Sequence, residues 1–184
     1  MLLISALCVF PRRWEFPIAC ALAIPAFLGR WLLPQVGYGT ILMIVWLLCW
    51  VCFLTLTDMV ILRQVLISTR VTNDTISGAI CGYLLLGLIF AFVYEIEGLA
   101  YPGSFLINGA VSRLELGKIF DQHHIGDLIY YSYVTVASLG YGDLAPVSPP
   151  ARITAAMEAI AGQFYIAILI ARLVSIRYSK WGDE

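Results

Sequence analysis

The chain has 184 residues, of which 61% are hydrophobic and 12% are charged, and its formal net charge is −1. A soluble domain carries roughly 25% charged residues, so this chain cannot cover a surface that faces water, and we expect an integral membrane protein. The balanced charge gives no argument for a nucleic-acid partner. Because the membrane part takes up most of the length, we also expect no large soluble regulatory domain in this chain.

Two apolar segments in the N-terminal part predict a pair of transmembrane helices. The first, 16–33, approaches the roughly 20 residues that span a bilayer only if the helix continues past Arg30. Pro25 predicts a kink within it. The second segment, 36–57, is uncharged throughout, and the helix is predicted to end at Asp58.

The segment 58–74 that follows is mixed, with Arg63 and Arg70 among aliphatic residues. This pattern indicates an amphipathic connector that lies at the membrane surface. Two arginines outside any apolar span do not make the arginine-rich helix of a voltage sensor, so anchoring to the inner surface is the preferred interpretation. The connector closes the first of three predicted units, residues 1–74.

The second half contains two further apolar spans with a long segment between them. The first span, 76–94, is uncharged, and the second runs from about 151 to 176. The polar segment 95–126 is expected to form an extracellular turret with one short helix. After it, 128–137 is an apolar and aromatic run of helical length, for which Asp127 is the expected N-cap.

A glycine-alternating motif, 138–143, comes directly after this aromatic run and has the sequence SLGYGD. Glycine at alternate positions lets the backbone take positive φ where other residues cannot, so successive carbonyls can point toward one axis. Within a membrane, non-helical backbone is tolerated only where it is buried in protein or lines a water-filled cavity. A ring of carbonyls around a dehydrated cation meets that condition.

The motif resembles the signature TVGYGD of the potassium-channel selectivity filter. Its setting between two apolar spans resembles the prokaryotic two-helix potassium-channel pore domain, over residues 75–178. The resemblance implies an outer helix, a turret, a re-entrant pore helix, the filter and an inner helix, followed by a short cytoplasmic tail, 179–184. It also implies a homotetramer with K+ ions in the filter and no organic cofactor, since one loop cannot enclose a pore. The expected fold class is therefore an all-α membrane protein with four transmembrane helices per chain.

The resemblance assigns the ion-binding role to five filter residues. K+ would be bound by the backbone carbonyls of Ser138, Leu139, Gly140 and Tyr141, with Gly142 completing the filter and the Ser138 hydroxyl as the innermost ligand. Two residues depart from the usual pattern. Ser138 replaces threonine and loses a methyl group that restricts χ1, and Leu139 replaces valine. Potassium selectivity is therefore the first hypothesis, and a non-selective monovalent cation channel of the same architecture is the alternative.

Support for the filter is expected from aromatic residues around it. The family implies that Tyr141 points outward into an aromatic cuff with Tyr130 and Tyr131. Asp143, just past the filter, is placed to hydrogen-bond one of these tyrosines. A belt of interfacial aromatic residues is the other interpretation of the tyrosines, and the two roles are compatible.

Glu158 is one of the few ionisable residues within a predicted span. Such a residue should face protein or water and not lipid. We expect it to hydrogen-bond the pore helix behind the filter, for instance at Thr135 or Tyr133. A charge at the cavity entrance is disfavoured because Glu158 lies near the outer end of its span.

The last span carries residues that suggest a gate. Gly162 lies where the family often has a hinge glycine, and close helix packing is the alternative reason for a glycine there. Gln163, Ile166, Ile170 and Val174 share one helix face, so Gln163 would line a wet cavity while Ile170 and Val174 close it by dewetting. A plain packing face explains the three aliphatic residues equally well.

A reading from a different class is a non-conducting scaffold or an enzyme embedded in the membrane. Its polar candidates are Glu158 and the adjacent pair His123 and His124. The other interpretations of the two histidines are solvated loop residues, sensors of external pH and metal ligands. No pair of nucleophile and base is visible in the sequence, so we expect no enzyme.

Loop charges predict the orientation. With the filter loop outside, seven Lys or Arg residues lie inside (12, 13, 63, 70, 172, 177 and 180) and four outside (30, 113, 118 and 152), in agreement with the positive-inside rule. The outer segments would then form an acidic mouth that attracts cations, with Glu95, Glu97, Glu115, Asp121, Asp127 and Asp143. We expect a multi-pass protein of a prokaryotic plasma membrane, with both termini cytoplasmic.

Overall fold

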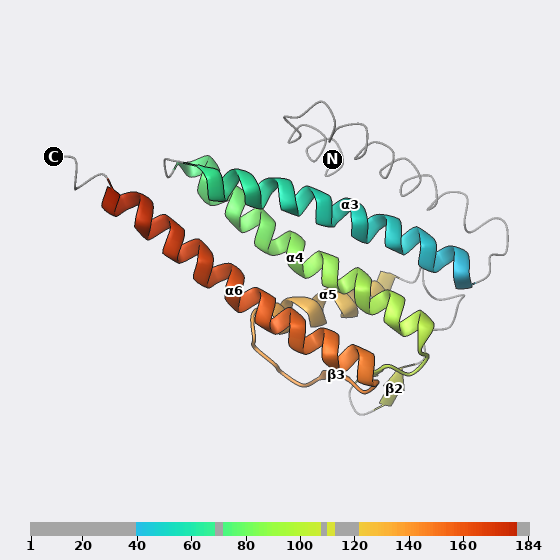
Figure 1. The fold of residues 1–184 in the computed structure, drawn as a ribbon. Coiled ribbons are helices and arrows are strands. Elements are labelled where there is room, and N and C mark those ends of the chain that lie inside the picture. Colours follow the sequence, from blue (N-terminus) through green and yellow to red (C-terminus); the bar gives the residue numbers. More distant parts are fainter. Residues whose placement is uncertain (1–39, 69–71, 108–109, 113–121, 180–184) are drawn as a thin grey trace.

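The computed structural model describes residues 40–68, 72–107, 110–112 and 122–179. The helix predicted within 16–33 and most of the tail lie outside these residues. The described part is mostly helical, with three long helices, α3, α4 and α6, and one short helix, α5 (Figure 1). Each long helix contains a stretch that is long and apolar enough to cross a membrane.

Helix α3 spans Thr40–Ile67, so the predicted end at Asp58 is wrong. The residues after Asp58 include no glycine or proline and favour continued helix. Asp58 is 9% exposed and therefore does not mark a membrane surface. The part of the predicted connector up to Ile67 is a continuation of this helix.

Helix α4 spans Asn73–Ala100 and begins with a capping box in which Thr72 and Thr75 bond each other's backbone N–H. It continues past the predicted end of its span at residue 94, and Glu95 and Glu97 are helical residues. Glu95 is buried, and Glu97 accepts a hydrogen bond from the Thr154 hydroxyl at 2.5 Å. These two acids therefore do not belong to a solvated mouth, contrary to the sequence-based expectation.

Helices α3 and α4 lie side by side along most of their length (Figure 1). Trp50 of α3 stacks on Phe92 of α4, with ring centroids 5.9 Å apart, and Phe53 is buried in the same contact. Large aromatic surfaces are thereby removed from lipid on the inner side of the pair.

A small sheet at one end of the helices corrects the all-α prediction. Its order is β2-β1-β3, and both pairings are antiparallel, between β1 (Phe105–Ile107), β2 (Ala110–Ser112) and β3 (Leu144–Pro146). The sequence Asn108-Gly109 separates β1 from β2, and this dipeptide is a strong hairpin signal. The short helix predicted in the turret is not among the described residues of 101–112, and the rest of the turret up to residue 121 lies outside the described residues.

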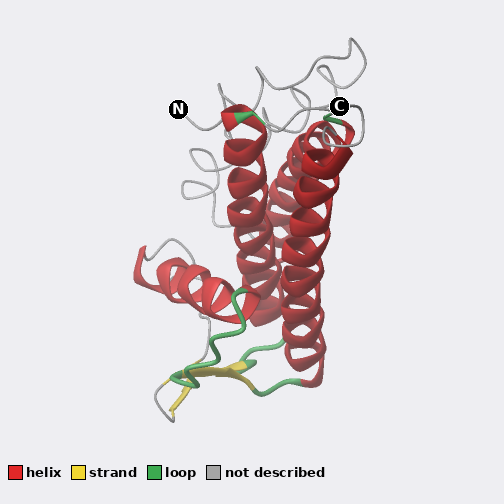
Figure 2. Cartoon of the chain, turned by 90° about the vertical axis from the view of Figure 1, so that its left-hand side faces the viewer, coloured by secondary structure: helices red, strands yellow, loops and turns green. Residues whose placement is uncertain are grey.

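Helix α5 spans Gln122–Val136 and lies crosswise to the long helices, near the end that carries the strands (Figure 2). Asp127 is inside this helix and cannot be its N-cap, because Gln122, five residues before it, is already helical. Helix α6 spans Pro149–Ser179 and starts with two prolines, which are favoured in a first helical turn because they lack N–H groups that would be unpaired there.

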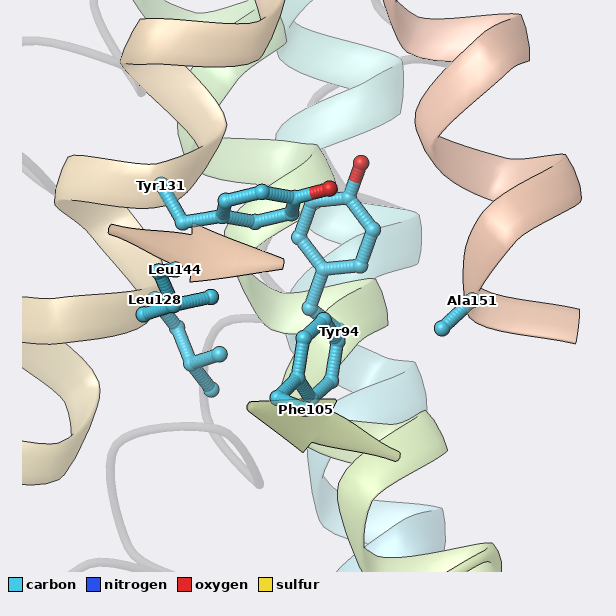
Figure 3. Packing of buried hydrophobic residues seen from close by; sticks show 6 residues of the cluster. All are labelled: Tyr94, Phe105, Leu128, Tyr131, Leu144 and Ala151. Atoms are coloured by element: carbon cyan, nitrogen blue, oxygen red, sulfur yellow. The ribbon is translucent and has the colours of Figure 1, made fainter. Parts of the chain in front are cut away.

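One hydrophobic cluster joins all the elements around the loop that follows α5 (Figure 3). Its members come from α4, β1, α5, β3 and α6, and are Tyr94, Phe105, Leu128, Tyr131, Leu144 and Ala151. The cluster fixes both ends of the segment 137–143, because Tyr131 precedes that segment and Leu144 follows it.

Candidate functional site

In the segment 137–143, called the filter loop below, the backbone has a positive φ at every second residue from Ser138 to Gly142. Ser138, Gly140 and Gly142 have φ values of 56°, 59° and 79°, whereas Leu139 and Tyr141 are not in the positive region. In a strand successive carbonyls point to opposite sides, and reversing the hand at every second residue brings them to one side. Ser138 is the one non-glycine residue with positive φ in the described chain, a conformation that costs of order 1–3 kcal/mol and is concentrated at functional sites.

The start of the filter loop is fixed by the end of α5. The N–H groups of Ser138 and Leu139 donate to the carbonyls of Thr135 and Val134, each at 2.8 Å. The Ser138 hydroxyl accepts a hydrogen bond from the Gln163 side chain of α6 at 3.0 Å. Gln163 therefore lies beside the inner end of the loop, at the level where a wet cavity was predicted.

The far end of the loop is fixed by Asp143 and the sheet. Asp143 accepts a hydrogen bond from the N–H of Leu144 at 3.0 Å. Its carboxylate also interacts with the Tyr130 hydroxyl and raises the pKa of that hydroxyl, because the neighbouring negative charge favours the protonated form. The predicted hydrogen bond between Asp143 and a tyrosine stays a prediction. Beyond Asp143, β3 pairs with β1, and the N–H of Val147 donates to Ser104 at 2.7 Å.

Within one chain, the three tyrosines predicted to form an aromatic cuff lie in different environments. Tyr131 is 6% exposed and packs against Tyr94 and Phe105, at centroid distances of 5.0 and 5.8 Å. Tyr130 and Tyr141 are exposed.

Glu158 is fully buried behind the filter loop, and it bonds the short helix at a residue that was not predicted. Its carboxylate accepts hydrogen bonds from the hydroxyl of Ser132 in α5 and, at 2.5 Å, from the hydroxyl of Tyr94 in α4. Both partners have no exposed surface. Glu158 of α6 therefore joins three helices through two hydroxyl groups.

The two partners that the sequence suggested for Glu158 are engaged elsewhere. Thr135 donates to the carbonyl of Tyr131 in its own helix at 2.9 Å, and the Tyr133 hydroxyl donates to the carbonyl of Leu84 at 3.0 Å. Ser132 was overlooked, although a small hydroxyl residue within an apolar helix is a typical interhelical contact.

Gly162 lies where α6 crosses the end of α5. A Cβ atom at this position would be 2.3 Å from the carbonyl oxygen of Val136, so no larger residue fits without a shift of backbone. The Val136 carbonyl also accepts a hydrogen bond from the Tyr83 hydroxyl of α4 at 3.1 Å. Helix α6 is continuous through Gly162, and these contacts support close packing as the reason for the glycine.

The rest of α6 presents two exposed faces. The residues predicted to line a cavity, Ile166, Ile170 and Val174, are exposed on the same side as Gln163. A second exposed apolar face is spaced at three to four residues along the helix and consists of Ile153, Met157, Ile160, Phe164 and Ile168. In a single chain, both faces are largely exposed, apart from the contact of Gln163 with Ser138.

Comparison with protein families matches residues 78–177 to a family described as "Ion channel". Similar curated proteins include "Two pore potassium channel c" of Oryza sativa subsp. japonica, 26% identical over 96 residues, and "Potassium voltage-gated channel subfamily A member 7" of Homo sapiens, 32% identical over 92 residues. These matches cover 50% and 49% of this chain, and 19% and 18% of the relatives. The chain thus spans less than a fifth of the length of these relatives. No solved structure gave a significant match.

Proposed function

The chain belongs to the ion channel family, whose model covers more than half of it, and on this premise we propose that it conducts K+ passively across a membrane through a homotetrameric pore. The family is one of ion channels and not of enzymes. The observation that carries the choice of ion is the alternation of backbone hand at Ser138, Gly140 and Gly142. The relatives whose names specify potassium channels support the same choice.

In this proposal the carbonyls of Ser138, Leu139, Gly140 and Tyr141 replace the water around a dehydrated K+ ion. Gly142 is the last residue of the filter loop with a positive φ. The Ser138 hydroxyl adds the innermost ligand, and its bond with Gln163 holds it in place. Helix α5 ends immediately before the loop, and the partial negative charge of its C-terminal end favours a cation there.

A tetramer is proposed because one loop cannot surround an ion. The filter loop is exposed along its whole length in the single chain, including 66% of Tyr141 and 55% of Leu139. Neighbouring copies would cover these side chains from behind. The second exposed face of α6, described above, would contact the adjacent subunit, while the face with Gln163 would line the shared cavity.

Closure of the pore is proposed at the inner part of that cavity. Ile170 and Val174 lie below Ile166 and Gln163 on one face of α6, and four copies of such aliphatic residues can form a constriction that excludes water. The exposure of these side chains in the single chain supports this assignment.

The protein is an integral membrane protein with several spans. We propose that the filter loop faces the exterior, as in the orientation derived from the loop charges. Arg63 of α3 and Arg172 of α6 lie toward the opposite ends of their helices from the loop, and Arg152 lies at the loop end. The proposed location is a prokaryotic plasma membrane with cytoplasmic termini and with residues 1–74 as a helix pair beside the pore.

A second candidate is a non-selective monovalent cation channel of the same architecture. The observation that favours it is Leu139, which replaces the usual valine and is 55% exposed. No residue of the described chain packs it firmly, so neighbouring subunits alone would restrain the loop at this point.

The test is the reversal potential of purified protein in a planar bilayer, with K+ on one side and Na+ on the other. A reversal near the potassium equilibrium potential is expected. Current that reverses near zero would overturn potassium selectivity and favour the second candidate. A matched variant, Leu139→Val, restores the usual filter residue and should leave a selective channel selective, but should shift the reversal potential of a non-selective one.

A further inference from the structure

Asp58 of α3, Gly82 of α4 and Tyr165 of α6 meet at one point within the membrane-spanning part. Asp58 and Tyr165 are each 9% exposed. A Cβ atom on Gly82 would lie 2.4 Å from the hydroxyl oxygen of Tyr165 and 3.0 Å from the Oδ1 atom of Asp58. The two oxygens therefore share the space that the missing side chain of Gly82 leaves open.

The hydrogen atoms at this point can be counted. A tyrosine hydroxyl has one proton, and that of Tyr165 is donated to the carbonyl of Ala79 at 2.8 Å. The Oδ1 atom of Asp58 has no hydrogen-bond partner in the described structure. An ionised carboxylate would therefore face the lone pairs of the Tyr165 oxygen, whereas a protonated one can donate to them.

The surroundings penalise an unpaired charge. A buried carboxylate without a hydrogen bond is costly in an apolar interior, and acids within membrane segments are usually functional and occupied by a partner. The partner that we assign to Asp58 is a proton, since both oxygens lie against the space beside Gly82.

We propose that Asp58 is a regulatory proton-binding site that switches the hydrogen bond of Tyr165 between two helices. When Asp58 takes up a proton from water, its carboxyl donates to the Tyr165 oxygen and Tyr165 donates to Ala79 of α4. When Asp58 releases the proton, the Tyr165 hydroxyl turns and donates to the carboxylate of α3. The hydrogen bond that Tyr165 of α6 donates thus moves from α4 to α3.

The switch reaches the filter loop through two contacts. The Tyr165 ring packs on the Tyr83 ring, with centroids 5.7 Å apart, and the Tyr83 hydroxyl holds the carbonyl of Val136. Gly162, one turn before Tyr165, packs on that same carbonyl. Val136 is the last residue of α5, two residues before Ser138, so a change at Tyr165 acts on the inner end of the filter.

Other titratable groups surround the site. Tyr165 of α6 is the group that faces Asp58, Cys81 of α4 interacts with Tyr165, and Glu158 of α6 interacts with Tyr83. On α3 itself the next charged residue is Arg63, whose side chain is exposed. Glu158 is the competing carboxyl, and a test of the proposal must separate it from Asp58.

Proton binding is tested first, without any current, by infrared difference spectroscopy of the reconstituted protein between about pH 4 and pH 9, a range that covers shifted carboxyl groups. A protonated carboxyl band that titrates and is absent in Asp58→Asn is expected. The same band should persist in Glu158→Gln. If no titrating carboxyl band is lost in Asp58→Asn, the proton site is refuted whether or not the protein conducts K+.

The regulatory consequence rests on the proposed channel function and is tested by open probability in symmetric K+ as pH is varied. The wild type should change about fivefold, the shift that one hydrogen bond gives to an equilibrium. Asp58→Asn should keep, at every pH, the open probability that the wild type shows at low pH. The reason is that the amide N–H can donate to the Tyr165 oxygen as the protonated carboxyl does. Tyr165→Phe keeps the ring contact and should also lose the pH response.

Two results would overturn the regulatory role. One is an Asp58→Asn channel that keeps the full pH response, and the other is a Tyr165→Phe channel that does so. The Glu158→Gln channel serves as the matched control and should retain the response. If the infrared titration is as expected but neither the wild type nor any variant passes current, the channel function is contradicted and the proton site is not.

Discussion

The filter loop and the contact behind it lie within one region of the molecule but are built in opposite ways. The loop 137–143 is exposed, and its shape resides in backbone torsions at Ser138, Gly140 and Gly142. Behind it, Glu158, Ser132 and Tyr94 have no exposed surface, and their side chains meet across three helices. The loop is thus specified locally by residue type, whereas its support is specified by how the helices pack.

This difference predicts how each region fails. A change in the loop should abolish ion passage while the helices stay folded, because few contacts of the chain depend on the loop. A change in the contact behind it should destabilise the fold first and ion passage second. Each experiment below tests one side of this comparison.

The largest effect is expected from Gly140→Ala. Gly140 has a φ of 59° with no atom within 4 Å of an added Cβ, so the change acts on backbone conformation and not by collision within the chain. A left-handed alanine costs roughly 1–2 kcal/mol, and four subunits would contribute, so K+ flux into liposomes should fall at least about a hundredfold. The oligomer, measured by native mass spectrometry, should persist.

Gly126→Ala is the control for that experiment. Gly126 lies within α5 and also has open space around an added Cβ, but its φ is not positive. Flux should be unchanged, and helix stability should increase by up to about 1 kcal/mol. Equal losses of K+ flux in both variants would mean that the positive φ at alternate residues of the filter loop has no special role.

A smaller effect on flux, with a clear effect on stability, is expected at Glu158. Replacing it with alanine leaves the Tyr94 hydroxyl without its acceptor, whereas the Ser132 hydroxyl keeps the carbonyl of Gly87, and an unpartnered buried group costs about 1–3 kcal/mol. The thermal midpoint of the oligomer should fall. Glu158→Gln keeps one acceptor and should lose less than half as much, and full activity in that variant would exclude an electrostatic role for the charge.

The matched control is Glu97→Gln, since Glu97 is a carboxyl whose side chain bonds only Thr154 among the described residues. Its effect on the midpoint should be smaller than that of Glu158→Ala. An Ala variant at 158 that melts and conducts like the wild type would remove the distinction between loop and support.

Features carried by neighbouring residues were predictable from the sequence. The apolar runs that became α4 and α6 are long enough to identify membrane helices, and the glycine alternation at 138–143 predicted the reversals of backbone hand. The hairpin of β1 and β2 also has a local signal, the sequence Asn108-Gly109.

Features that depend on helix rotation were not predictable. Neighbouring helix positions differ by about 100°, so the choice of Ser132 over Tyr133 as the partner of Glu158 follows from how α5 is turned against α6. The sequence predicts the end of a span at Asp58 because a charge within an apolar run usually marks a membrane surface. Its burial depends on Gly82 and Tyr165, which lie on two other helices.

The smallest effect is expected where loop and support touch, at the bond between Ser138 and Gln163. Ser138→Ala removes the acceptor of the Gln163 amide and the innermost ligand proposed for K+. The loss of one hydrogen bond of about 1 kcal/mol should weaken block by internal Ba2+ about fivefold and lower unitary conductance, with selectivity retained. Ser138→Thr keeps the oxygen and should behave as the wild type. Because the backbone carbonyls are untouched in both variants, unchanged Ba2+ block in the alanine variant would show that the Ser138 side chain is no ion ligand and that the backbone alone makes the site.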